Sequence, residues 1–157
     1  MAMSERLRRL LDAHRVAYDS LTHAETFTSP ETAASLHVPG REMAKTVIVK
    51  AGDRYFMLVL PAHERIDLDK AARLLNVNMT CLATEDEIRA LFPDCEPGAM
   101  PPFGELYGVP EYVDQSLTRE EEIICVAGNH HEAIKMRTGD FMKLTHPTVA
   151  DFHASRA

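Results

Sequence analysis

Residues 44–61 read AKTVIVKAGDRYFMLVLP, and this stretch decides the fold. Two apolar, largely β-forming runs, 46–49 and 55–60, flank the segment AGDR at 51–54, whose Gly and Asp favour a turn. The pattern predicts a β-hairpin. Both arms are nearly continuous in apolar residues, which indicates a strand pair that is buried on both faces.

Helix and strand signals alternate irregularly along the rest of the chain. Capping residues ahead of apolar residues at helical spacing predict helices with N-caps at Ser4, Ser29, Asp67 and Thr84. Runs of β-forming residues predict strands over residues 18–23, 77–82, 123–127 and 133–136. Residues 93–110 are rich in Pro and Gly and predict a long loop, and residues 139–152 predict one or two short helices. Because there is no strict β-α-β order, we expect an α/β fold with a mixed sheet or a partly closed barrel flanked by helices.

The composition is that of a small globular protein. The 157 residues, 45% of them hydrophobic, suit a single compact domain over 1–157 with its own core. Three cysteines without a CxxC pair argue against disulfides and against a cysteine-built zinc site, and Cys81 and Cys125 fall within predicted apolar strands as core residues. No apolar run approaches the roughly 18 residues of a membrane span. We expect a cytoplasmic protein with no membrane partner.

The chain is acidic, with 17 Lys and Arg against 24 Asp and Glu, a formal charge of −7. Contact with nucleic-acid phosphates would therefore need a local cluster of basic groups. The candidates are Arg6, Arg8, Arg9 and Arg15 in the first predicted helix, and Arg41, Lys45 and Lys50 near the hairpin. Arg8 and Arg15 are seven residues apart and would share a helix face. The four arginines form either such a contact or simply a solvated face.

Lys45 and the loop at 98–104 are the first two candidates for chemistry. Lys45 precedes the most apolar strand, where an ammonium group either meets an anion or carbonyl or reaches back to water. The loop reads GAMPPFG, with two prolines and two glycines that can fix N–H groups in set directions, as needed to stabilise an oxyanion. The available donors are the non-proline residues Gly98, Ala99, Met100, Phe103 and Gly104. The alternative is a rigid surface turn.

The third candidate is His130-His131, in the turn between the last two predicted strands. Adjacent residues on a strand point to opposite faces, so only one of the two would line a given pocket from strand positions. Together with His63 they match no zinc spacing, and we expect neither a metal nor a cofactor. The sequence also contains no GxSxG, P-loop or GxGxxG motif.

Taken in order, several motifs resemble the YbaK/ProX family, which is related to the editing domain inserted in some bacterial prolyl-tRNA synthetases. They are AKTVIV at 44–49, VLP at 59–61 with RID at 65–67, the GxxxP loop at 98–104, YVD at 112–114 and GNHHEAI at 128–134. The resemblance covers roughly residues 20 to 150. It implies a YbaK-like fold and a trans-editing hydrolase that cleaves the ester between a wrongly attached amino acid and the tRNA 3′ end.

The resemblance also implies roles for residues of this chain. Lys45 is expected to be essential for activity, with Gly98, Ala99 and Met100 holding the aminoacyl carbonyl region. The residues expected to bind substrate are Thr46, Pro101, Pro102, Phe103, Gly104 and His130, with His131 as a weaker alternative to His130. No metal is expected, and the partners are the acceptor end of a mischarged tRNA and an aminoacyl-tRNA synthetase. The main alternative is a non-catalytic module that binds aminoacyl groups or tRNA ends, and a third is a small-molecule esterase.

Overall fold

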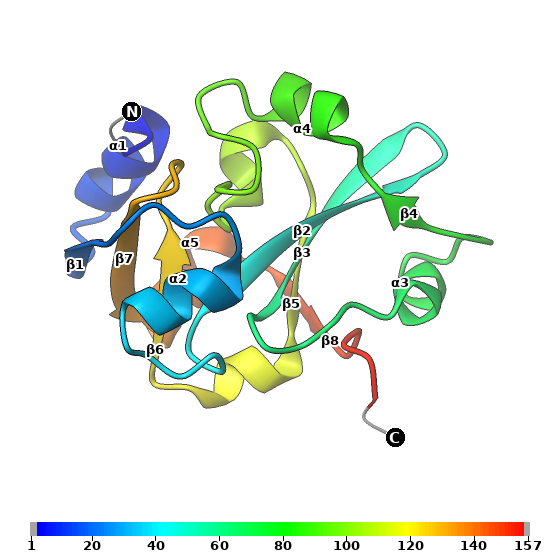
Figure 1. Ribbon diagram of the computed structural model, residues 1–157. Coiled ribbons are helices and arrows are strands. Elements are labelled where there is room, and N and C mark those ends of the chain that lie inside the picture. The colour runs from blue at the N-terminus through cyan, green and yellow to red at the C-terminus, as the bar shows by residue number, and fades with distance from the viewer. Residues whose placement is uncertain (1–2, 156–157) are drawn as a thin grey trace.

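The hairpin of residues 44–61 lies inside a five-stranded sheet in the computed structural model, which describes residues 3–155 (Figure 1). Strands β2 (Ala44–Ala51) and β3 (Arg54–Pro61) pair antiparallel around a two-residue turn. The sheet order is β4-β2-β3-β5-β8, with β4 at Cys81–Leu82, β5 at Glu111–Asp114 and β8 at Thr148–Ala150. The β3–β5 and β5–β8 pairs are parallel. The sheet is therefore mixed, which confirms the predicted α/β class.

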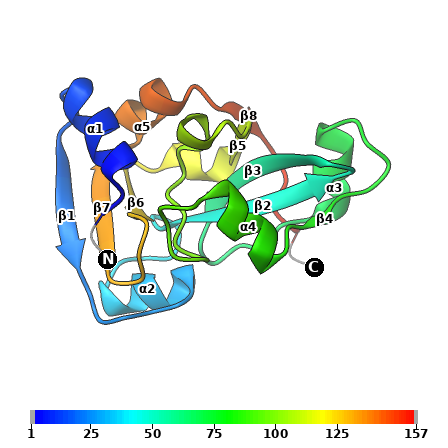
Figure 2. The ribbon, with the colours of Figure 1, turned by 90° about the horizontal axis from the view of Figure 1, so that it is seen from above.

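A second, three-stranded antiparallel sheet stands beside the first (Figure 2). Its order is β1-β7-β6, formed by Tyr18–Thr22, Glu132–Arg137 and Glu122–Val126. The two sheets touch where Met43, just before β2, bridges to Ile124 of β6. Neither sheet closes on itself, so the mixed sheet forms rather than the barrel.

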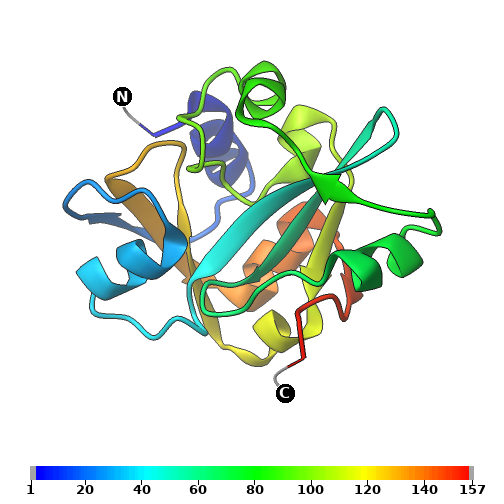
Figure 3. The same ribbon diagram turned by 45° about the vertical axis from the view of Figure 1, so that its right-hand side comes forward.

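Within the described residues, five short α-helices cover these sheets, and two 3₁₀ turns stand before and after β5. The α-helices are α1 (Glu5–Ala13), α2 (Ser29–Ser35), α3 (Leu68–Leu74), α4 (Glu85–Leu91) and α5 (Thr138–Thr145), and the 3₁₀ turns are η1 (Gly104–Tyr107) and η2 (Gln115–Arg119). Figure 3 shows α5 behind the hairpin and α3 beside β4. No helix within residues 3–155 combines the length and apolar character needed to cross a membrane.

The central position of β3 follows from burial on both of its faces. Met57 and Val59 pack into the main core together with residues of α1, α5 and β6, and Phe56, Leu58 and Leu60 pack with Ala71 of α3 and with Phe152. Period-2 alternation places these two sets on opposite faces. The prediction of a doubly buried strand is confirmed for β3, whereas β2 is only partly covered.

Several local predictions are corrected by the structure. The N-cap of α2 is Thr28, whose side chain accepts a hydrogen bond from Glu31 N, and not Ser29. Ser4 occupies the N-cap position of α1 as predicted, but its side chain makes no capping bond and its hydroxyl donates to Asp94 instead. Arg15 follows the end of α1 with a φ of 53° and so does not share a helix face with Arg8.

The strand predicted over residues 77–82 is reduced to Cys81–Leu82, and Cys81 is exposed rather than a core residue. The predicted helical tail contains one helix and then β8, which the sequence pattern did not indicate. β5 was likewise missed. The predicted loop 93–110 is largely irregular, with η1 inside it.

Candidate functional site at the edge of strand β2

The edge of β2 that faces away from β3 is only partly covered. β4 pairs with it at Val49 and Lys50, and Ala83 N donates to Ile48 O. Between Lys45 and Val47 the described residues provide no strand partner on this side, and a cavity of about 430 Å³ lies there. We call it the β2-edge cavity; its lining residues are Phe27, Thr28, Ser29, Pro30, Lys45, Thr46, Val47 and Gly98.

A neighbouring hollow of about 490 Å³ shares two of these residues. It is lined by Phe27, Glu85, Ile88, Arg89, Pro97, Gly98 and His130, and we call it the His130 cavity. Two hollows of about 540 and 600 Å³ lie elsewhere and contain none of the site residues predicted from sequence. The fold therefore brings Lys45, Thr46, Gly98 and His130 to two adjoining cavities.

Lys45 is the second residue of β2 and is half-buried at the mouth of the β2-edge cavity. Its Nζ donates to the main-chain oxygen of Glu64. Burial lowers the pKa of Lys45, since removing an ammonium from water disfavours its charged form; the Glu64 carboxylate opposes this shift, and the charge of Arg65 adds to it. The side chain thus offers a partly desolvated cation to whatever occupies the cavity.

Gly98 forms the opposite wall of both cavities. Its φ of +87° is a conformation that residues with a side chain rarely adopt, so glycine is needed here. A Cβ at this position would lie 3.5 Å from His130 Cε1. Its N–H points to the sulfur of Met100 at 3.2 Å, a weak acceptor.

Most of the other loop N–H groups predicted as donors are already used within the protein. Ala99 N donates to Glu96 O, Phe103 N to Pro101 O, and Gly104 N to Glu111 Oε1 at 2.7 Å. Of the loop residues, Gly98 is the one that reaches the cavities. A ligand in either cavity would therefore contact this loop through Gly98, its first residue.

The end of the loop is part of the protein core. Pro101 and Pro102 are buried, and Phe103 is 1% exposed, with its ring edge-on to Phe141 at 5.6 Å between centroids. A Cβ on Gly104 would lie only 2.4 Å from Val109 O. These residues hold the loop in place and do not line either cavity, although the sequence suggested that they bind substrate.

His130 is buried, with 8% of its surface exposed, and lies in the turn before β7. Its Nε2 is 2.9 Å from Pro97 O; since a carbonyl can only accept, Nε2 carries the proton. Its ring also packs against the Phe27 ring, tilted by 51° and with 5.0 Å between the ring centroids. His131 N donates to Asn129 in the same turn, and His131 lines neither cavity.

Several lining residues were missed by sequence reasoning, and Phe27 is the one of them that lines both cavities. It is 63% exposed, and it lines both cavities. A single aromatic residue in the segment TFTSP has no periodicity or motif that would have indicated this role. The position follows from the path of the chain between β1 and α2.

The basic residues considered as nucleic-acid contacts are mostly paired with acids. Arg8 pairs with Glu5 at 2.7 Å, Arg41 with Glu120 at 3.0 Å, and Lys50 with Glu87 at 2.6 Å. Arg6 lies 3.9 Å from Asp94 and over the ring of Tyr107. The described surface therefore contains no concentrated patch of unpaired arginines on α1.

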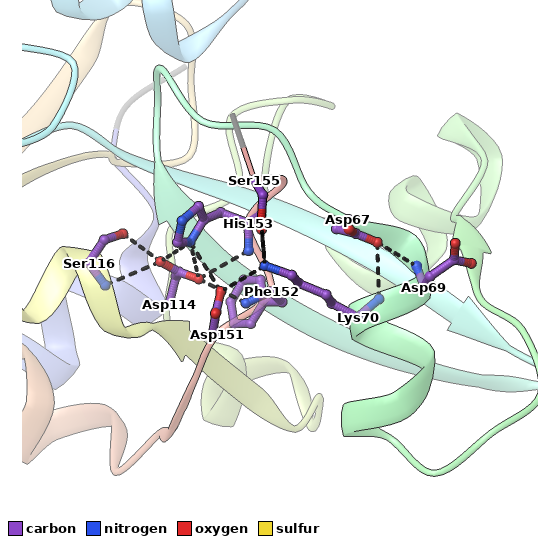
Figure 4. Close-up of polar contacts among 9 residues, drawn as sticks. All are labelled: Asp67, Asp69, Lys70, Asp114, Ser116, Asp151, Phe152, His153 and Ser155. Carbon is purple, nitrogen blue, oxygen red and sulfur yellow. Dashed lines mark hydrogen bonds and ion pairs between the residues drawn. The ribbon is translucent and has the colours of Figure 1, made fainter. Parts of the chain in front are cut away.

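The described residues that could ligate a metal lie outside both cavities: Asp114, Asp151 and His153 (Figure 4). Asp114 is fully buried and accepts hydrogen bonds from Ser116 N, Phe152 N and His153 N. Burial alone would raise the pKa of Asp114, but these hydrogen bonds and that from the His153 side chain outweigh it and lower that pKa. The group has a clear structural use, because it fixes the C-terminal segment to β5.

The fold is that of an α/β protein, and its candidate site is built from a strand edge, a glycine loop and a lysine. Residues 23–144 match the aminoacyl-tRNA editing domain family, and the chain belongs to this family. The resemblance to YbaK/ProX proteins is thereby confirmed.

The relatives include much longer proteins. The chain is 29% identical over 106 residues to a proline–tRNA ligase of Bacillus subtilis (strain 168), covering 66% of this chain and 19% of the ligase. It is 35% identical over 77 residues to a proline–tRNA ligase of Thiobacillus denitrificans, covering 49% of this chain and 13% of the ligase. The chain thus spans a fifth or less of these relatives.

A crystal structure described as a proposed trans-editing enzyme for prolyl tRNA synthetase has the same fold. Its TM-score is 0.83 at 23% identity, covering 98% of this chain and 100% of that chain.

Proposed function

We propose that this chain is a trans-editing aminoacyl-tRNA deacylase that acts as a single domain. The observation that carries the proposal is the meeting of Lys45 and Gly98 across the β2-edge cavity, in a member of the editing-domain family. An aminoacyl ester is already activated, so positioning and electrostatic stabilisation are enough to accelerate its hydrolysis.

In the proposed reaction, water attacks the ester carbonyl and the bond to the ribose oxygen breaks. The amino acid leaves as a carboxylic acid, and the tRNA regains its hydroxyl group. Lys45 neutralises negative charge, either on the carbonyl oxygen or on the phosphate of the terminal nucleotide. Gly98, the first residue of the loop, lies against the aminoacyl group, with His130 and Phe27 beside it, and the buried Ala99 and Met100 hold Gly98 in place. No step requires a metal.

The proposed substrate is the acceptor end of a mischarged tRNA. Both curated relatives are proline–tRNA ligases, so tRNA charged by prolyl-tRNA synthetase with a wrong amino acid is the first substrate to test. The synthetase itself is the proposed partner, and the cytoplasm the proposed site of action.

The deciding experiment is deacylation of a panel of mischarged tRNAs, including tRNAPro carrying small amino acids, with free aminoacyl esters as controls. We expect turnover of at least one mischarged tRNA, and unchanged turnover in EDTA. Tight binding without turnover would support the non-catalytic module instead. Equal turnover of simple esters would indicate a general esterase, and loss in EDTA restored by zinc would contradict the metal-free reaction.

A further inference from the structure

The hydrogen-bonding direction of each β2 residue follows from its ladder with β3. The two-residue turn makes Ala51 and Arg54 a hydrogen-bonded pair, and such pairs alternate along an antiparallel ladder. Every second residue back from Ala51 therefore faces β3, and the residues between face away. Two bonds agree with this phase: Ala83 N donates to Ile48 O from outside, and Met57 N, opposite Ile48, donates to Pro110 O.

Thr46 is two residues from Ile48 and so also turns its main-chain N–H and C=O away from β3. On that side lies the β2-edge cavity, which Thr46 lines with its neighbours Lys45 and Val47. Neighbouring side chains on a strand point to opposite faces, so a cavity lined by all three must lie at the strand edge. The hydroxyl oxygen Oγ1 of Thr46 is buried and has no hydrogen-bond partner among the described residues.

We infer that the aminoacyl group of the substrate pairs with Thr46 as a single added strand residue. Its α-amino group donates to Thr46 O, and its ester carbonyl accepts from Thr46 N–H, the two-bond pairing of strand addition at an open edge. This rests on the proposed function and deepens it. Thr46 N–H becomes a main-chain donor to the reacting carbonyl, and the substrate class becomes α-aminoacyl esters with a free α-amino group.

The inference explains why this part of the β2 edge is open. A longer β4 would occupy the N–H and C=O of Thr46, whereas the observed β4 ends its pairing with β2 at Val49 and Lys50. Gly98, on the far wall of the cavity, admits a ligand close to its main chain because it has no side chain.

Three substitutions at one position test the donor. Thr46→Pro removes the N–H without removing a ladder bond, because proline is tolerated where a strand N–H faces outward. Thr46→Val removes only the hydroxyl, and Thr46→Ser keeps both groups. We expect kcat on mischarged tRNA to be about 100-fold or more lower for Thr46→Pro than for Thr46→Val, as when an oxyanion donor is lost. Equal kcat in these two variants, with equal melting temperatures, would overturn the inference.

A binding measurement separates this inference from the proposed function. The probe is 3′-alanylamino-3′-deoxyadenosine, whose amide link resists hydrolysis, and its control is the propionyl analogue without the α-amino group. In ¹⁵N-resolved NMR of the wild-type protein, we expect the Thr46 amide proton to shift downfield with the alanyl probe. The propionyl analogue should bind about 10-fold more weakly, since a hydrogen bond from a charged donor is lost.

The two experiments give distinct outcomes. If the alanyl probe binds and shifts the Thr46 amide proton, but no mischarged tRNA is turned over, the proposed function is contradicted and the edge pairing is supported. If mischarged tRNA is turned over but the Thr46 amide proton does not shift, or if both probes bind equally well, the edge pairing is contradicted and the proposed function is supported.

Discussion

Lys45 carries the proposed chemistry at the scale of single residues. We expect Lys45→Ala to lower kcat/KM for mischarged tRNA by about 100-fold or more, because a partly desolvated charge at the reacting group is lost. The melting temperature should change little, since the side chain is half-exposed. Deacylation assays and thermal melts measure the two effects.

Lys50 provides a matched control on the same strand. It pairs with Glu87 and lines neither cavity, so Lys50→Ala should keep its activity per folded molecule. Similar losses from both substitutions would mean that a general charge effect, and not Lys45 itself, supports turnover.

Glu111 gives a prediction about pH. Burial raises the pKa of this carboxyl to about 8, opposed by the bond from Gly104 N. The folded protein thus holds the proton more tightly than the unfolded chain does, and this contribution to stability is lost as pH rises from about 4.5 through 8. Glu111→Gln cannot ionise, so it should stabilise the protein relative to wild type above pH 8, by on the order of 1–3 kcal/mol.

Urea unfolding of the wild type and of Glu111→Gln, at about pH 5 and about pH 9, measures this difference. The gain should be small at the lower pH, where the wild-type carboxyl is protonated. An equal gain at both values would show that the carboxyl does not titrate on unfolding in this range.

The loop that begins at Gly98 is the element on which the site depends. Gly98→Val forces a β-branched residue into a positive φ and places its side chain against His130. We expect activity to fall by about 10-fold or more, with a loss of stability of about 1–2 kcal/mol. Deacylation rates and urea unfolding separate the two effects.

Gly108→Val is the control for backbone strain. Gly108 has a φ of +67°, open space around it, and no contact with either cavity. It should lose similar stability and keep its activity. If both variants lose activity equally, the Gly98 loop has only a structural role.

Elements whose signals are local were predictable from sequence. The β2–β3 hairpin depends on its turn residues, and the capping box of Thr84 and Glu87 forms as its spacing indicates. Strands β5 and β8 are short and pair in parallel with partners distant in sequence, so no local pattern identifies them.

The residues of the candidate site that stand in local motifs were predictable from sequence, and those placed by contacts between distant segments were not. Lys45 and Gly98 stand in recognisable motifs, and the structure brings them to one cavity. The placement of Phe103 in the core and the use of Gly104 N by Glu111 depend on contacts that local sequence does not show. The position of Phe27 at the cavities depends on the path of the chain between β1 and α2.

The net charge of the whole molecule determines how strongly it should bind tRNA and how this binding should depend on salt. With a formal charge of −7 and most candidate basic groups paired, few phosphates would be neutralised. We expect weak binding whose salt dependence is shallower than that of a protein with about 6–10 phosphate contacts. The measurement is kcat/KM for mischarged tRNA over a range of salt concentrations.

Charge reversal locates any contact made by the first helix and its end. Arg8→Glu with Arg15→Glu should raise KM severalfold for aminoacyl-tRNA and leave hydrolysis of a minimal aminoacyl-nucleotide unchanged. Equal losses of activity on both substrates would mean that these arginines stabilise the fold. No loss of activity on either substrate would mean that they are solvated side chains without a role in binding.

The open edge of β2 has a cost for the molecule in solution. An uncovered strand edge is a template on which a second copy can add its own strand and begin to aggregate. Here the open stretch is short and begins with Lys45. A charged side chain on an edge strand discourages pairing with a strand of a second copy. The lysine proposed for deacylation would then also oppose aggregation, so Lys45→Ala should aggregate more readily than the wild type at high protein concentration.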